Sequence, residues 1–187
     1  MKSAYEIVMV GFAGCCGAGL IAEKKASELR SRYPVFIIRN AVIEGRISYR
    51  EPVLSLLREK EDDYEIIGME AVGDGGVFKG LWQLGESCNV GFSADLKSIP
   101  IRQETVEICN FYDINPYELY SDGVFLFLAK DGSGLARELS ANGIPAAVIG
   151  RTHSEKKRVI VNEDEERFIE PRHTDSLISL NEEEKPG

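Results

Sequence analysis

Short apolar runs alternate with amphipathic segments along most of the chain. Runs rich in Val, Ile and Phe and bounded by Gly, Asp or Pro predict strands at residues 6–10, 64–69, 90–96, 124–129, 146–149, 158–161 and 167–169. Segments with apolar residues every three or four positions predict helices at residues 20–32, 77–87, 102–112 and 135–142. Gly143 follows the last helix, where a glycine commonly closes a helix.

Prolines and glycines mark the less regular parts of the chain. Pro34 and Pro52 each suit the first turn of a helix, which predicts helices at 35–43 and 53–57. The first of these segments is also compatible with a strand, because Val, Phe and Ile dominate it. Residues 59–63 form a charged connection, and the glycines that follow the first strand predict a flexible or closely packed turn at Gly11, Gly14, Gly17 and Gly19.

The order of these elements predicts the fold class. Strands alternate with helices through most of the chain and end in a run of three strands, which favours a mixed sheet covered by helices, an α+β or α/β sandwich. The helix at 77–87 is expected to bury one stripe, formed by Phe78, Leu81, Trp82 and Leu84. The helix at 102–112 is expected to turn Val106, Cys109 and Ile108 inward.

Composition and charge narrow the classes of partner. With 187 residues, 43% hydrophobic and 28% charged, the chain has the composition of an ordinary globular protein. Its net charge of −9 argues against nucleic acid and anionic membranes as partners. Residues 162–187 alone carry nine acidic against three basic residues, so the chain end is expected to be a solvated acidic tail, although such tails also serve as interaction segments.

Cysteine and histidine give no sign of a metal or redox site. Cys15, Cys16, Cys88 and Cys109 lack metal-ligand spacing, so a reducing compartment and a packing role are expected. His153, expected in an exposed turn, and His173 are far from any cysteine cluster. No metal is therefore expected.

The apolar run from Ile7 to Ala22 has to be weighed as a targeting segment. Residues 12–15 could pass for a lipoprotein cleavage box, which leaves a lipid-anchored protein as an alternative. The strongly apolar part, however, is at the minimum length for a leader, and the run is too short to span a bilayer. A cytoplasmic location is favoured.

The candidate chemistry lies at residues 70–76, ahead of the helix at 77–87. A Gly75–Gly76 pair at a helix start offers backbone N–H groups and the positive end of the helix dipole to an anion. Glu70 and Asp74 belong to the same stretch, just before the glycine pair. The chain shows no nucleotide-binding loop of the Walker type and no nucleophile elbow.

Several stretches together resemble the C-terminal domain of the aminoimidazole ribonucleotide (AIR) synthase superfamily, especially its hydrogenase expression/formation (HypE-like) branch. The similar stretches are residues 7–22, 70–86, 99–104, 113–119, 121–123, 146–150 and 170–177, in the family's order. No single stretch is decisive, but seven in the right order are fairly specific.

The resemblance implies a PurM C-terminal domain-like fold of three α/β/α layers, with helices on both faces of a mixed sheet and a partly ferredoxin-like arrangement. It implies an N-terminal strand with linking helices at 1–63, the domain proper at 64–178 and an acidic tail at 179–187. It adds Glu70, Asp74 and Ser121 to the anion-binding candidates, with Glu70 and Asp74 expected to line a cleft shared with an N-terminal domain if one docks there. In the family a separate N-terminal domain supplies most ATP and metal ligands and the main dimer interface, so no cofactor is expected unless a partner domain completes an ATP–Mg site.

The sequence also departs from the family pattern. Ala71 and Gly73 stand where the family usually has Asp and Thr, and Asp74 adds negative charge where a phosphate would dock. Two unit charges about 4 Å apart repel by about 1 to 4 kcal/mol, so ATP-dependent catalysis at this site is not expected. No cysteine follows Cys109, whereas the hydrogenase maturation enzyme uses a C-terminal one.

Two functions remain from these observations. The first is a stand-alone, non-catalytic binding or accessory module that forms a homo-oligomer or pairs with a family member. The second is one half of a split ATP-dependent enzyme, completed by a separate N-terminal-domain chain.

Overall fold

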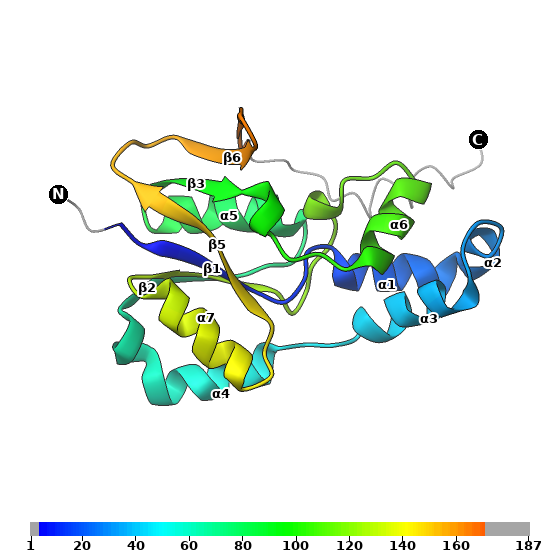
Figure 1. Cartoon of the computed structure of the whole chain (residues 1–187), viewed down its shortest axis with the longest axis horizontal. Coiled ribbons are helices and arrows are strands. Elements are labelled where there is room, and N and C mark those ends of the chain that lie inside the picture. The colour runs from blue at the N-terminus through cyan, green and yellow to red at the C-terminus, as the bar shows by residue number, and fades with distance from the viewer. Residues whose placement is uncertain (1–3, 171–187) are drawn as a thin grey trace.

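A seven-stranded mixed sheet forms the centre of the computed structural model, which describes residues 4–170 (Figure 1). The strands lie in the order β2-β4-β1-β5-β3-β6-β7, and every neighbouring pair is antiparallel except β3–β6. Their bounds are β1 Glu6–Val10, β2 Ile66–Ala71, β3 Gly91–Asp95, β4 Phe125–Ala129, β5 Ala146–His153, β6 Arg158–Asn162 and β7 Glu165–Phe168.

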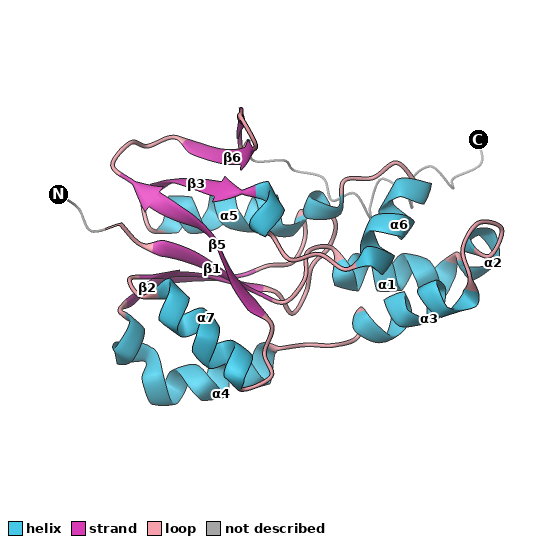
Figure 2. Ribbon diagram, in the orientation of Figure 1, coloured by secondary structure: helices cyan, strands magenta, loops and turns pink. Residues whose placement is uncertain are grey.

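Helices cover the sheet on both faces and form a separate cluster beyond one end of it (Figure 2). One face packs against α5 (Gly76–Ser87), and the other against α4 (Arg50–Lys60) and α7 (Gly132–Ala141). The separate cluster consists of α1 (Cys15–Lys24), α2 (Ala26–Leu29), α3 (Val35–Glu44) and α6 (Gln103–Phe111). Three 3-10 turns, η1 Glu61–Tyr64, η2 Leu96–Ser98 and η3 Pro116–Glu118, complete the elements. The expected three-layer α+β fold is confirmed.

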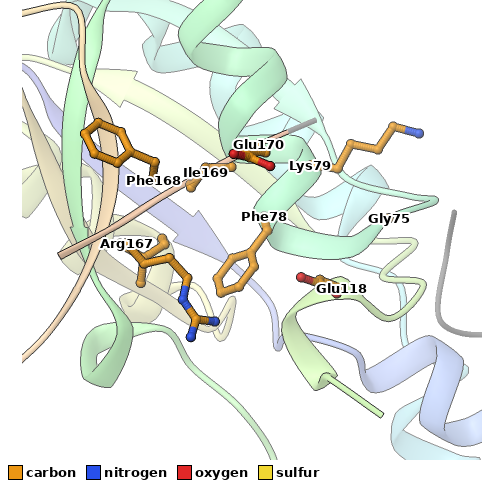
Figure 3. Close-up of a pocket in the computed structure, with 9 residues that line it drawn as sticks. Gly75, Phe78, Lys79, Glu118, Arg167, Phe168, Ile169 and Glu170 are labelled. Carbon is orange, nitrogen blue, oxygen red and sulfur yellow. The ribbon is translucent and has the colours of Figure 1, made fainter. Parts of the chain in front are cut away.

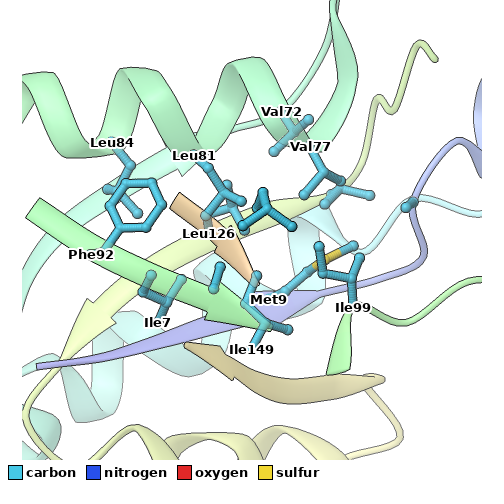
Figure 4. Close-up of a cluster of buried hydrophobic side chains, with 14 of the residues drawn as sticks. Ile7, Met9, Val72, Val77, Leu81, Leu84, Phe92, Ile99, Leu126 and Ile149 are labelled. Carbon is cyan, nitrogen blue, oxygen red and sulfur yellow. The ribbon is translucent and has the colours of Figure 1, made fainter. Parts of the chain in front are cut away.

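The interior strand β1, which lies between β4 and β5, joins the two sheet-based cores. Its four apolar residues are fully buried and alternate between the faces, as side chains of a strand do. Ile7 and Met9 pack on the α5 side, where Figure 4 shows them beneath Leu81 and Leu126. Val8 and Val10 pack on the α7 side. Because β1 pairs with β4 and β5, the first strand shares one sheet with the second half of the chain. The boundary expected at residue 63 stays a prediction, and the tail at 179–187 lies outside the described residues.

The glycine turn expected after β1 is wrong in its second half. Gly17 and Gly19 lie inside α1, which begins at Cys15. A Cβ on Gly19 would lie 2.9 Å from both the Ala41 carbonyl oxygen and Gly45 Cα, so glycine is needed for α1 and α3 to approach closely. This helix ends at Lys24 rather than near residue 32.

Other details also differ from the expectations. Residues 35–43 are helical, which excludes the alternative strand. The charged connection at 59–63 is instead the end of α4 and the 3-10 turn η1. In α6 the fully inward residues are Thr105, Ile108 and Cys109, whereas Val106 is half-buried.

The apolar run from Ile7 to Ala22 forms β1 and most of α1. Among the described residues, no helix has both the length and the apolar character that crossing a bilayer requires.

Candidate functional site

The turn between β2 and α5 places two glycines with left-handed backbones at a helix start. Gly75 has φ 77° and Gly76 has φ 64°. A Cβ on Gly76 would lie 2.5 Å from the Tyr117 carbonyl oxygen and 2.7 Å from the Leu119 carbonyl oxygen, so no larger residue fits there. The Gly76 N–H donates to the Gly73 carbonyl oxygen (3.2 Å) and is therefore not free for a ligand, contrary to the sequence expectation.

This helix start opens onto a pocket of about 370 Å³ (Figure 3). One wall comes from α5, one from η3, and the third from β6, β7 and the two residues that follow β7. The lining residues are Gly75, Phe78, Lys79, Glu118, Ile160, Arg167, Phe168, Ile169 and Glu170. In Figure 3, Phe78 lies between Arg167 and Glu118, whereas the Lys79 side chain extends away from Arg167.

The electrostatics at the start of α5 favour an anion. No side chain caps the helix, and its first turn contains no acidic residue. The unpaired N–H groups of a first turn carry a partial positive charge, which an anion stabilises. Arg167 supplies a full positive charge on the opposite wall.

Two carboxylates and an aromatic stack give the rest of the pocket its character. Glu118 and Glu170 line it and can accept hydrogen bonds from a ligand. Phe78 stacks on Tyr117, with ring centroids 5.3 Å apart and planes 13° from parallel. The pocket therefore combines an anion site, hydrogen-bond acceptors and a flat apolar surface.

The structure brings only part of the predicted site to this pocket. Gly75 lines it and Gly76 begins α5, but Asp74 is exposed and does not line it. Glu70 lies on β2 and is also outside the lining; burial raises the pKa of its carboxyl above the usual value.

Ser121 has a structural place next to the glycine turn. Its hydroxyl accepts from the Gly14 N–H (2.9 Å) and donates to the Leu119 carbonyl oxygen (2.7 Å), and the residue is fully buried. Its own N–H donates to the Gly73 carbonyl oxygen (3.2 Å). Ser121 thus connects the start of α1 to the turn before α5 and positions that turn.

Sequence reasoning missed most of the pocket wall. It placed Phe78 in a buried stripe, but Phe78 and Trp82 are only half-buried, and Val77, Leu81 and Leu84 form the buried stripe. Arg167 and Phe168 belong to a strand far along the chain, and no spacing links them to Gly75. One signal was available in the sequence. Lys79 is the fourth residue of α5, where the helix dipole is unfavourable for a cation, and a bound anion would offset that unfavourable interaction.

The cysteines and the described histidine behave as packing or surface residues. All four cysteines are free, and burial raises the pKa of Cys15 to about 11 and that of Cys109 to about 12, which keeps both thiols protonated. His153 is half-buried at the end of β5 rather than in an exposed turn, with Nδ1 3.0 Å from the Glu155 carbonyl oxygen. Within residues 4–170 no three His, Cys, Asp or Glu side chains cluster as metal ligands; His173 lies outside that range.

Comparison with known proteins identifies the domain type. Residues 6–162 match the sequence model of the family described as "AIR synthase related protein, C-terminal domain". A comparison with curated proteins finds no match.

Solved structures share this fold over most of the chain. HypE from a HypE–HypF complex has 18% identity and a TM-score of 0.69, covering 91% of this chain and 53% of its own. E. coli HypE has 13% identity and a TM-score of 0.69, covering 94% and 52%. Thiamine monophosphate kinase from Aquifex aeolicus has 16% identity and a TM-score of 0.55, covering 89% and 52%. The chain thus spans about half the length of these structures.

Proposed function

Since the chain belongs to the AIR synthase related proteins through their C-terminal domain, we propose that it is a binding or accessory module for a small anionic ligand, without ATP turnover of its own. The pocket at the start of α5 is the proposed binding site. The observation that carries this proposal is the uncapped helix start, free of acidic residues, which faces Arg167 across the pocket.

The lining residues indicate the kind of ligand. A phosphate or carboxylate would bind the first-turn N–H groups of α5 and the Arg167 guanidinium. Glu118 and Glu170 would accept hydrogen bonds from hydroxyl, amino or amide groups elsewhere on the ligand. The exposed face of Phe78 would contact a planar part of it.

The absence of catalysis is proposed from the departures in the turn before α5. Ala71 and Gly73 have no side-chain group to hold a reacting phosphate or its metal ion, whereas the resemblance leads us to expect Asp and Thr there.

The test is a titration of the full chain with inorganic phosphate and with ATP–Mg, following melting temperature and phosphate release. We expect inorganic phosphate to give a saturable rise in melting temperature. With ATP–Mg we expect no phosphate release. Arg167→Gln should weaken binding at least fivefold. Arg137→Gln, a charge change at an exposed position of α7 on the other face of the sheet, should leave binding unchanged. ATP turnover by this chain alone, or no stabilisation by either ligand, would refute the proposal.

A second candidate function is one half of a split ATP-dependent enzyme. It is supported by the length of the matched structures, about twice that of this chain. A separate chain with the family's N-terminal domain would then supply the ATP–Mg ligands, and Gly75 would lie in the shared cleft. Co-purification of such a chain, with ATP turnover that needs both chains and is lost in Arg167→Gln, would favour this function over the first.

A further inference from the structure

The outward face of α3 carries an apolar stripe that no described residue covers. Seven large hydrophobic side chains are exposed among the described residues, and four of them lie on α3 or just after it: Val35 (59% exposed), Phe36 (55%), Ile43 (53%) and Ile47 (42%). The opposite side of the helix, formed by Ile37, Ile38 and Ala41, is buried. Such clustering is typical of an interaction surface, whereas scattered exposed hydrophobics are not.

The stretch of sequence that contains this stripe is basic. Residues 23–50 contain seven Lys or Arg and three Glu, a net charge of +4, in a chain whose net charge is −9. Arg39 lies on α3 one helical turn from both Val35 and Ile43, and Arg46 follows two residues after the helix ends at Glu44. Both arginines are exposed, and Arg46 forms a 2.7 Å ion pair with Glu23. The surface formed by Val35, Phe36, Arg39, Ile43, Arg46 and Ile47, called here the α3 face, is therefore both apolar and basic.

We propose that the α3 face binds the C-terminal segment of a second copy of this chain, residues 177–184. This segment lies outside the described residues, and its sequence has the complementary composition. Leu177, Ile178 and Leu180 supply apolar side chains, and Glu182, Glu183 and Glu184 follow directly. Exchange of these segments between two copies gives a symmetric dimer in which each α3 face is covered.

Geometry favours a second copy over the same chain as the source. The described chain ends at Glu170, beside the pocket at η3 and α5. The linker of residues 171–176 spans at most about 20 Å when fully extended. Figure 1 shows α1 between η3, which lies at the pocket, and α3, so the linker of the same copy would have to pass around α1, which is about 10 Å across with side chains.

Charge argues against two other occupants of the α3 face. Direct packing of α3 on α3 of a second copy would bring the basic residues Arg39 and Arg46 of the two copies onto the same contact, and like charges there are unfavourable. An anionic membrane would attract the α3 face but repel the remaining chain, which has a net charge of −13. A peptide with both acidic and apolar residues complements the positive charge and the apolar character of the α3 face.

The dimer can be tested with the full chain by analytical ultracentrifugation at 1–100 µM. We expect the wild type to dimerise, and both Ile43→Asp and the triple change of Glu182, Glu183 and Glu184 to Lys to raise the dissociation constant more than tenfold. Combining the triple change with Arg39→Glu and Arg46→Glu should restore the dimer. Met69→Asp is the matched control, since Met69 on β2 is exposed to a similar extent (48%, against 53% for Ile43). Circular dichroism checks that each variant is folded.

Several results would overturn the proposal. These are a wild type that stays monomeric at 100 µM, a dimer that resists the triple change, and a dimer that Met69→Asp disrupts as strongly as Ile43→Asp. Dissociation by Ile43→Asp alone would assign the contact to α3–α3 packing. Binding to vesicles with 30% anionic lipid, without dimerisation, would assign the α3 face to membranes. The proposal goes beyond the anion site, and Arg167→Gln should leave the dimer intact.

Discussion

Helices α5 and α7 pack on opposite faces of the sheet, and each follows a strand through a turn rich in Asp and Gly. Their first turns nevertheless differ in how the partial positive charge of the N–H groups is neutralised. At α7 the N–H groups are satisfied by carboxylates of the chain itself. Asp131 Oδ1 accepts from the Gly134 N–H (2.8 Å), and Glu6 Oε2 accepts from the Ser133 N–H (2.8 Å) and hydroxyl (3.0 Å). At α5 no side chain performs either role.

The position of one aspartate explains the difference. Asp131 directly precedes the first residue of α7 and occupies the N-cap position. Asp74 is separated from the first residue of α5 by Gly75, whose left-handed backbone takes the N-cap position instead. Similar composition thus gives one helix start that carboxylates of the chain neutralise and one that no side chain caps.

The largest expected effect comes from Gly76→Ala, which would disrupt the α5 turn. A left-handed backbone costs a residue with a Cβ about 1–2 kcal/mol, and the clash with the η3 carbonyls adds about 1–3 kcal/mol. We expect a loss of about 3 kcal/mol in the free energy of unfolding, measured by urea titration. Gly73→Ala, whose Cβ would have nothing within 4 Å, should change it by less than about 0.5 kcal/mol. An equal loss in both variants would contradict the steric explanation.

The next effect concerns the α7 cap. Asp131→Ala should lower the free energy of unfolding by about 1 kcal/mol, because the Gly134 N–H loses its partner. Asp74→Ala should leave stability nearly unchanged, since no side chain caps α5. If both substitutions cost the same in urea titration, the contrast between the two helix starts is wrong.

The third prediction uses the pH dependence of Glu6. Burial opposes ionisation of its carboxyl, but hydrogen bonds from Ser133 and the Arg151 guanidinium outweigh this and lower its pKa below the usual 4.5. A lowered pKa in the folded state adds stability above the unfolded-state pKa, and that stability is lost as pH falls through the folded-state pKa.

Glu6→Gln should therefore be less stable than the wild type at pH 7, by about 1 kcal/mol. This difference should shrink as pH falls below about 4.5, the unfolded value. Thermal unfolding of both proteins between pH 3 and pH 7 measures it. A constant difference over this range would mean that the Glu6 charge does not stabilise α7.

The smallest effect is on ligand affinity. Asp74 is exposed beside Gly75, and a charge about 4 Å away in water contributes about 1 kcal/mol or less. Asp74→Asn should therefore tighten phosphate binding about two- to fivefold at low salt, as measured by thermal shift, and much less at 0.5 M salt. Asp164→Asn, an exposed charge in the turn between β6 and β7, is the control and should have a smaller effect.

The sequence predicted the elements better than it predicted the site. Apolar runs such as residues 124–129 located the strands, because complete burial leaves few alternatives for a short Val, Leu and Phe segment. Gly17 and Gly19 misled the analysis, because glycine is poor for an isolated helix and its benefit appears only when α1 meets α3.

The pocket depends on a juxtaposition that local patterns do not contain. Gly75 was identifiable from the helix start that follows it. Arg167 and Phe168 reach the pocket because β6 pairs with β3 and β7 pairs with β6, and Ile160 of β6 packs in the same cluster as the buried residues of α5. Pairing between distant strands depends on the whole fold, and so the far wall was not predictable from the residues near Gly75.

The position of β1 between β4 and β5 has a consequence for the order in which the chain folds. Its partners, β4 and β5, begin at residues 125 and 146. At a synthesis rate of about 5–20 residues per second, the ribosome needs roughly 6–23 s after β1 to reach the first of them. Throughout that interval Ile7, Val8, Met9 and Val10 have no strand to pair with, so the nascent chain offers an apolar segment to chaperones until its second half has emerged.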